Sequence, residues 1–307
     1  MYKDMHPSRT STAITTVARV LLGMLLLLLP AACVREDVDG CLQYALDMRV
    51  VDGEGNDLTG SGILEKAEVY LFNRNGFVRM VPTGISSGFL FWEDRSEKLT
   101  LVAWGNVKED TLLTTHIAVG TSLEDARLML RQHAGGTHLP VTDLFYCRKE
   151  LNEAATQTRG IQEDRLTLVM ERMAAGVSVR TLGFAEQYPG GGSPCHIIVR
   201  GSGTGLDFTG KAVGDEAGYR PVSFIDAAGD IHTQPFHVFP TYGEQHVEID
   251  IYRKEEKLCT VTKDCNFEPI CTPAGKQTDI TLDFRYTRVK VMVEILPWGE
   301  VSQDTEI

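Results

Sequence analysis

Residues 67–80 read AEVYLFNRNGFVRM, and this stretch has the composition and punctuation of a β-hairpin. Two runs rich in β-branched, aromatic and aliphatic residues flank Asn75 and Gly76, which both tolerate the positive φ angles of a tight turn. The segments on either side repeat this pattern of short apolar runs and turn residues. We therefore expect a protein built mainly from antiparallel strands.

Further along the chain in both directions, apolar and polar residues alternate with the period of two that a half-buried strand shows. The predicted strands are residues 42–50, 88–93, 98–104, 142–147, 166–170, 177–179, 246–253, 280–285 and 289–295. Residues 98–104 are apolar on both faces, which predicts a central strand. Short strands with frequent turns and no alternation of strands with helices indicate an all-β protein of sandwiches, and disfavour nucleotide-binding α/β folds.

Three segments interrupt the strand pattern. Residues 121–130 predict a short helix, because Thr121 and Glu124 have capping-box spacing and Leu123, Ala126 and Leu130 would share one helical face. Residues 189–193 and 201–210 are rich in glycine, and we expect loops there.

The chain of 307 residues is long enough for two domains. Residues 152–165 contain few large apolar side chains, which favours a domain boundary. We predict an N-terminal β-sandwich over residues 41–160 and a C-terminal β-sandwich over residues 161–307.

The N-terminus predicts a membrane-targeting signal. Basic residues precede an apolar run from Val20 to Ala32, which is too short for a spanning helix and ends in small residues before Cys33. This layout indicates a lipoprotein signal peptide over residues 1–32, with Cys33 as the acylated N-terminus and residues 33–40 as an acidic tether. The alternative is an ordinary cleaved signal with Cys33 as a structural thiol.

The charge of the chain excludes some classes of partner. The formal net charge is -12, and residues 1–32 carry three basic side chains and one acidic one, so their removal leaves about -14. Nucleic-acid binding needs clustered basic residues and is disfavoured. Anionic lipid would repel such a surface, so a membrane tie must be covalent.

Six cysteines remain if Cys33 is acylated: Cys41, Cys147, Cys195, Cys259, Cys265 and Cys271. They allow up to three disulfides in an oxidising compartment, and buried free thiols are an equal alternative. The five-residue gaps among the last three disfavour a structural zinc site.

The remaining motifs are weak indications of chemistry. GSGTG at residues 201–205 lacks the spacing, the Lys-Ser/Thr end and the following helix of a phosphate loop. The pairs His133 with His138 and His232 with His237 have five-residue spacing, whereas helical metal ligands are four apart. No nucleophile motif such as G-x-S-x-G occurs, and the cysteine and histidine spacings do not suit metal ligands, so we expect no enzyme, no metal and no cofactor. Trp92 and Trp104 suit a sugar platform or, more commonly, a core.

The order of these motifs resembles a known family. A lipoprotein start, an acidic tether, Cys41 opening the first strand, AEVYLFNRNGFV, LTLVAWGN, LTLVMERMAAGVSV and RVKVMVEILPWG follow one another. This is similar to the FimB/Mfa-type fimbrial anchor family, the minor subunits of type V fimbriae.

The resemblance implies two tandem transthyretin-like Greek-key β-sandwich domains. It implies that Cys33 is acylated, that Lys66 to Met80 form the first-domain hairpin and that Thr287 to Gly299 form the last strand. It also implies a surface-exposed protein in the outer membrane at the base of a fimbrium, in contact with a shaft subunit (fimbrillin) and in some members limiting fimbrial length. The acidic stretch after Cys33 resembles the surface-export signals of such lipoproteins.

The last strand has two alternative uses. Val289, Val291, Val293 and Ile295 alternate with polar residues, which suits a strand that completes its own sandwich or one that joins the first shaft subunit by strand pairing. Two competing functions are a surface lipoprotein that binds glycan or host protein, and a shaft or tip subunit.

Overall fold

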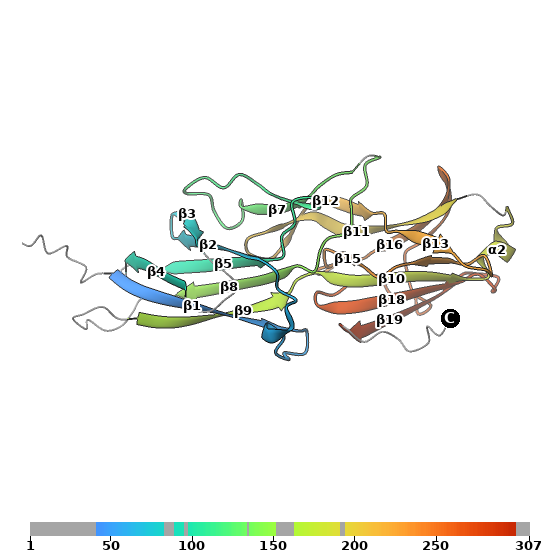
Figure 1. The fold of residues 1–307 in the computed structure, drawn as a ribbon. Coiled ribbons are helices and arrows are strands. Elements are labelled where there is room, and N and C mark those ends of the chain that lie inside the picture. Colours follow the sequence, from blue (N-terminus) through green and yellow to red (C-terminus); the bar gives the residue numbers. More distant parts are fainter. Residues whose placement is uncertain are drawn as a thin grey trace, which may run out of the picture.

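A computed structural model describes residues 41–82, 89–94, 98–133, 135–151, 163–190 and 194–298. The molecule is elongated, with the start of the first strand at one end and the short helix α2 (Phe184–Gln187) at the other (Figure 1). Within the described residues the only other helix is a 3₁₀ turn, η3 (Thr59–Ser61). The all-β prediction is confirmed.

The first sheet has seven strands in the order β3-β2-β5-β8-β9-β1-β4. These strands are β1 (Cys41–Val51), β2 (Ala67–Asn73), β3 (Gly76–Val81), β4 (Phe89–Asp94), β5 (Leu99–Gly105), β8 (Phe145–Leu151) and β9 (Glu163–Arg172). Neighbours are antiparallel except β1 and β9, which are parallel. The predicted hairpin is present as β2 and β3, with Gly76 at φ 106° after the turn.

Strand β5 is central, as its two apolar faces predict. Leu101 and Ala103 belong to a core cluster formed by one face of this sheet together with the loop residue Leu64. Val102 and Trp104 point the other way, into the larger core shared with the rest of the molecule.

Two further sheets have six strands each, most of them from the second half of the chain. One has the order β13-β14-β10-β18-β19 with β15 also paired to β10, and the other has the order β17-β16-β11-β7-β6 with β12 also paired to β11. Their strands are β6 (Leu112–Thr114), β7 (Arg127–Leu130), β10 (Ala175–Leu182), β11 (Cys195–Asp207), β12 (Ala212–Tyr219), β13 (Ser223–Ile225), β14 (Ile231–Thr233), β15 (Phe236–Val238), β16 (Glu248–Arg253), β17 (Glu256–Val261), β18 (Lys276–Asp283) and β19 (Lys290–Pro297).

The sheets do not divide at residue 160. Strand β9 lies beyond the predicted boundary but pairs with β1 and β8 in the first sheet. Conversely, β6 (Leu112–Thr114) and β7 (Arg127–Leu130) come from the first half, and β7 pairs with β11 in the second. The two halves are therefore interlocked, and the division at residue 160 stays a prediction about folding units.

The predicted helix over residues 121–130 is wrong. Residues 123–125 form a turn, and the N–H of Phe208 donates to the carbonyls of Leu123 and Ala126. The following residues are strand β7, with Leu128 and Leu130 buried on one face. A ten-residue helix is marginal by itself, so pairing with β6 and β11 outweighs the capping signal.

The predicted loop over residues 201–210 is also wrong, because β11 continues to Asp207. Up to Arg200 the strand pairs with β16, and from Gly205 it pairs with β7. The register with β12 shifts between these points. Gly201 has φ 125°, and a side chain there would collide with the carbonyl of His246. Glycine is required where the strand bends away from one partner towards another.

Candidate functional site

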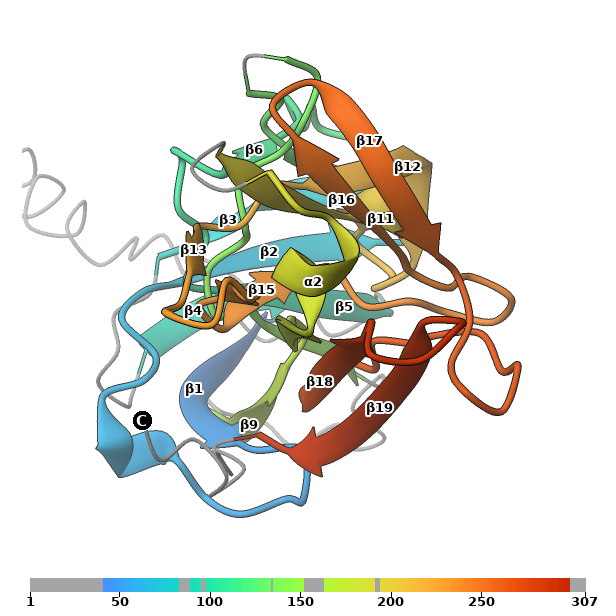
Figure 2. The ribbon, with the colours of Figure 1, turned by 90° about the vertical axis from the view of Figure 1, so that its right-hand side faces the viewer.

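Strand β19 is an edge strand that contains three of the four predicted junction residues, Val291, Val293 and Ile295, and directly follows the fourth, Val289. It pairs antiparallel with β18 from Lys290 opposite Asp283 to Pro297 opposite Lys276, with no irregularity of register. Its other edge faces away from the sheet (Figure 2). A sheet edge presents main-chain N–H and C=O groups that a further strand can pair with.

The predicted apolar face of β19 divides into two parts. Val291 is buried, and Val289 and Val293 are partly buried against the large core. Ile295 is 47% exposed. Three of the four residues thus complete the protein's own sandwich, and the fourth reaches solvent. Participation of this strand in a subunit junction stays a prediction.

The main-chain groups along the outer edge of β19 are occupied at one end. The N–H of Cys265 donates to the carbonyl of Val291 at 2.8 Å. Because β19 has no bulge, the backbone groups of Val293 and Ile295 face the same way as those of Val291. Among the described residues, no backbone group pairs with Val293 or Ile295 on this outer side.

Trp298 fixes the far end of β19. The Arg172 guanidinium lies over its ring, and the ring of His237 lies 4.8 Å away by centroid. Arg172 is buried and donates two hydrogen bonds to Asp143, of 2.6 and 2.8 Å. Burial lowers the pKa of His237. The end of the last strand is therefore tied to β9, a strand of the first sheet.

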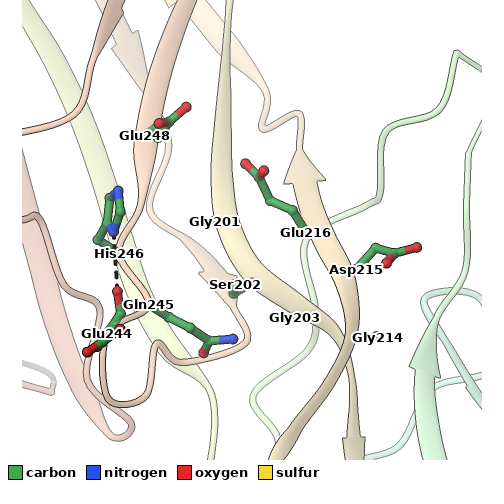
Figure 3. Close-up of a pocket in the computed structure, with 10 residues that line it drawn as sticks. All are labelled: Gly201, Ser202, Gly203, Gly214, Asp215, Glu216, Glu244, Gln245, His246 and Glu248. Atoms are coloured by element: carbon green, nitrogen blue, oxygen red, sulfur yellow. Dashed lines mark hydrogen bonds between the residues drawn. The ribbon is translucent and has the colours of Figure 1, made fainter.

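A pocket of about 440 Å³ lies where β11 changes partner (Figure 3). Asp215 and Glu216 lie to one side of the glycine-rich strand, and Glu244, His246 and Glu248 lie to the other. The carboxylates of this pocket would repel an anionic ligand such as phosphate. The glycines lie within strand β11, and the helix that follows the glycines of a phosphate loop is not present there. The structure thus gives no support to a phosphate loop at residues 201–205.

Arg200, beside this pocket, neutralises part of its charge. Its guanidinium pairs with Glu248 at 2.7 Å, Glu216 at 3.3 Å and the buried Asp250 at 2.7 Å. Burial acts to raise the pKa of Asp250, but hydrogen bonds from Arg200, Thr260 and Lys257 outweigh it and lower that pKa below its ordinary value. These contacts stabilise the β11–β16–β17 sheet rather than leave a reactive carboxylate.

A second pocket, of about 470 Å³, opens between the edge strands β3 and β6. Its floor includes Tyr70 and Phe77, and Met80 and Leu113 are half exposed along it. The Tyr70 hydroxyl donates to Glu68 at 2.7 Å, and burial raises the pKa of the phenol. The lining combines these apolar residues with charged and polar ones, including Glu109, His116 and Arg131.

The other predicted sites are spread through the fold. Trp104 is buried in the core, as the commoner interpretation of a strand aromatic predicts, and the side chain of Trp92 lies outside the described residues. His232 pairs with Asp226 at 2.9 Å, whereas His237 lies beside Trp298. Within the described part of the chain, no group of three metal-ligating side chains comes together.

The described cysteines form no disulfide with one another. They are Cys147, Cys195, Cys259, Cys265 and Cys271. The side chain of Cys41 and the whole of Cys33 lie outside the described residues, as does the predicted signal peptide. Neither described helix has the length or hydropathy needed to cross a bilayer.

Sequence reasoning missed Arg172, Asp143 and Phe267. The first two lie in unremarkable local contexts, and only the packing of two sheets brings them together. Phe267 lies in the polar turn DCNFEP, residues 264–269. Neither its exposure nor its φ angle of 66° is indicated by an alternation of apolar and polar residues around it. Trp298 belongs to the motif RVKVMVEILPWG, but no local pattern indicates its contact with Arg172.

Comparison with known proteins defines the class. The Major fimbrium anchoring subunit FimB of Porphyromonas gingivalis (strain W83) is 24% identical over 290 residues, which are 89% of this chain and 92% of that protein. A second FimB sequence from the same species is 23% identical over 290 residues. The fimbrial anchor protein Mfa2 from Porphyromonas gingivalis has the same fold, with a TM-score of 0.63 at 15% identity over 84% of this chain and 98% of that one.

The fold of this chain, with its interlocked β-sheets and edge strand β19, is thus similar to that of a fimbrial anchor protein. Residues 38–304 match the family model of the fimbrillin-A associated anchor proteins Mfa1 and Mfa2, and the chain belongs to this family. The family resemblance expected from the sequence is confirmed.

Proposed function

We propose that this protein anchors a fimbrium to the outer membrane through an acylated Cys33 and holds the first shaft subunit with its folded part. The observation that carries this proposal is the family match over residues 38–304, together with relatives that are named anchoring subunits and align over almost their whole length. The relatives are structural subunits, which supports a structural rather than an enzymatic role.

The shape of the molecule supports such an arrangement. Strand β1 begins at Cys41 at one end of the elongated molecule, and β19 lies in the half that ends in α2 (Figure 1). The eight-residue tether from Cys33 to Cys41 spans at most about 28 Å. A lipid at Cys33 would hold the first end close to the bilayer and leave the other half directed towards the fimbrium.

Acyl chains on Cys33 would bind the bilayer strongly enough to hold the protein without a membrane-spanning helix. Each buried methylene of an acyl chain contributes about 0.8 kcal/mol, and one chain alone gives only reversible binding. Two or more chains on Cys33 would make attachment stable. Attachment by charge is disfavoured because the protein is strongly acidic.

Deletion of the gene tests the proposal. Cells without the protein should shed their fimbriae into the medium, and a role in limiting length predicts longer fimbriae as well. Complementation with the full chain should restore rooted fimbriae. If fimbriae stay rooted and unchanged in length while glycan uptake or host-protein binding falls, the chain is a surface-binding lipoprotein instead.

A further inference from the structure

The outer edge of β19 is bordered by a short, rigid loop, residues 263–269. The N–H and C=O of Asp264 pair with Glu268 and Phe267, and the Asp264 carboxylate accepts the N–H groups of Asn266 at 2.8 Å and Glu268 at 2.9 Å. Lys263 and Pro269 form an isolated β-bridge at the base of the loop. These contacts leave the loop little freedom of its own.

Phe267 stands at the tip of this loop. Its side chain is 73% exposed, and its φ angle is 66°, a left-handed conformation that aromatic residues rarely adopt. A non-glycine residue persists in this region only where the surrounding contacts hold it there. The loop therefore presents a large apolar side chain to solvent on a backbone that hydrogen bonds hold in place.

The loop lies directly against the edge strand. The hydrogen bond from Cys265 N–H to Val291 C=O joins the two, and Figure 2 shows the segment after β17 beside β19. The loop thus blocks the edge at Val291 and leaves it open from Val293 to Pro297. Ile295, 47% exposed, lies in this open part.

The open edge suits one kind of occupant. Val293 and Ile295 each offer an outward N–H and C=O, and Pro297 offers only a carbonyl. Main-chain groups at this spacing are complementary to an extended polypeptide that adds as a further strand. Five residues of strand give a contact of only about 17 Å, so affinity needs an additional apolar anchor.

We propose that the edge of β19 from Val293 to Pro297 and the side chain of Phe267 form one docking surface for an extended segment of a fimbrial subunit. The incoming strand pairs with Val293 and Ile295, ends where Cys265 occupies Val291, and packs an apolar side chain against Phe267. The loop therefore fixes the register of the added strand. This inference rests on the proposed anchor function and adds the residues that perform it.

Site-specific photocrosslinking in fimbriated cells tests the docking surface. The full chain carries p-benzoylphenylalanine in place of Phe267 or, as a control, in place of Phe224. Phe224 is 50% exposed and lies on β13, the opposite edge of the same sheet. We expect position 267 to crosslink a fimbrial subunit, identified by mass spectrometry, at least ten-fold more than position 224. An equal yield at both positions, or a partner at position 267 that is not a fimbrial subunit, overturns the proposal.

Three variants separate docking from folding. Phe267→Gly suits the left-handed backbone, so its melting temperature should stay equal or rise while shedding of fimbriae increases several-fold. Ile295→Pro removes an outward N–H and should increase shedding with the β18–β19 amides still protected from exchange. Leu296→Pro removes an N–H directed at β18 and should expose those amides.

Rooted fimbriae in both Phe267→Gly and Ile295→Pro cells, with shedding in cells that lack the gene, overturn the docking surface and leave the anchor function standing. Rooted fimbriae in the gene deletion overturn the anchor function itself. The two failures are therefore distinguishable in one series of strains.

Discussion

The guanidinium carbon of Arg172 lies 4.2 Å from the centroid of the Trp298 ring and 5.2 Å from that of Phe145. Arg172 is the last residue of β9 in the first sheet, and Trp298 follows the last strand of another sheet. A single buried cation therefore links the two halves of the molecule and fixes the end of β19.

We expect Trp298→Ala to lower the free energy of unfolding by about 2 kcal/mol, because a desolvated cation–π contact is lost together with its packing. Amide exchange should increase at Val293 to Leu296, where β19 loses its fixed end. The matched control is Tyr286→Ala, since Lys290 lies over a ring that is 55% exposed and the contact contributes under about 1 kcal/mol. Equal losses in the two variants would contradict the linking role.

Arg172→Met should cost about 3 to 5 kcal/mol, measured by denaturant unfolding, because it leaves the Asp143 carboxylate without its buried partner. The Arg172 side chain is 2% exposed and that of Asp143 is 19% exposed. Arg49→Met breaks the pair with Asp57, whose side chains are about half exposed. That control should cost no more than about 1 kcal/mol.

Stability should decline as the pH falls from 7.5 to 5.5. Burial lowers the pKa values of His138 and His237 below the ordinary 6.5, so the unfolded chain binds protons in this range that the folded chain does not. Each such histidine contributes at most about 1.4 kcal/mol per pH unit. His237→Gln should reduce the slope of the unfolding free energy against pH, and an unchanged slope would exclude His237 as a source.

Gly201→Ala should destabilise the protein by about 1 to 3 kcal/mol from its φ angle of 125° alone, and more from the collision with His246. Thermal unfolding measures the effect. Gly218→Ala is the control, because its backbone has no positive φ and the nearest atoms to an added Cβ are 3.5 Å away. If both variants melt at the same temperature, β11 does not need the bend at Gly201.

Cys33→Ser should move the protein from the membrane pellet to the soluble fraction, because no acyl chain can be attached. Intact mass of the mature protein provides the direct check, since acylation at Cys33 adds the mass of the lipid. A serine variant that stays in the pellet with its fimbriae rooted would contradict the lipid anchor.

Local pattern predicted the strands well. The alternation in β1, β2, β16 and β19 and the turn before Gly76 depend on residues close in sequence. The same logic identified β5 as central, since a strand that is apolar on both faces must be covered on both. It was wrong at residues 121–130 and 201–210, where contacts distant in sequence outweigh a capping signal and a run of glycines.

The candidate site was predicted only in part. The apolar alternation of Val289 to Ile295 marked a strand with one face for a core. It did not show that Ile295 remains exposed, because exposure depends on which strands lie nearby. The loop that blocks the edge at Val291 comes from residues 263–269, and no pattern in either segment indicates that they meet.

The amino-acid sequence by itself determined the β character, the family and the predicted lipid attachment, because side-chain period, turn residues and an apolar signal are properties of neighbouring residues. Tertiary structure decided that β6 and β7 join the second half, that Arg172 meets Trp298 and that the loop carrying Phe267 meets β19 at Val291. These features arise from packing between segments that lie tens to more than a hundred residues apart in the sequence. Which segments meet depends on how the whole chain buries its apolar side chains and satisfies its hydrogen bonds.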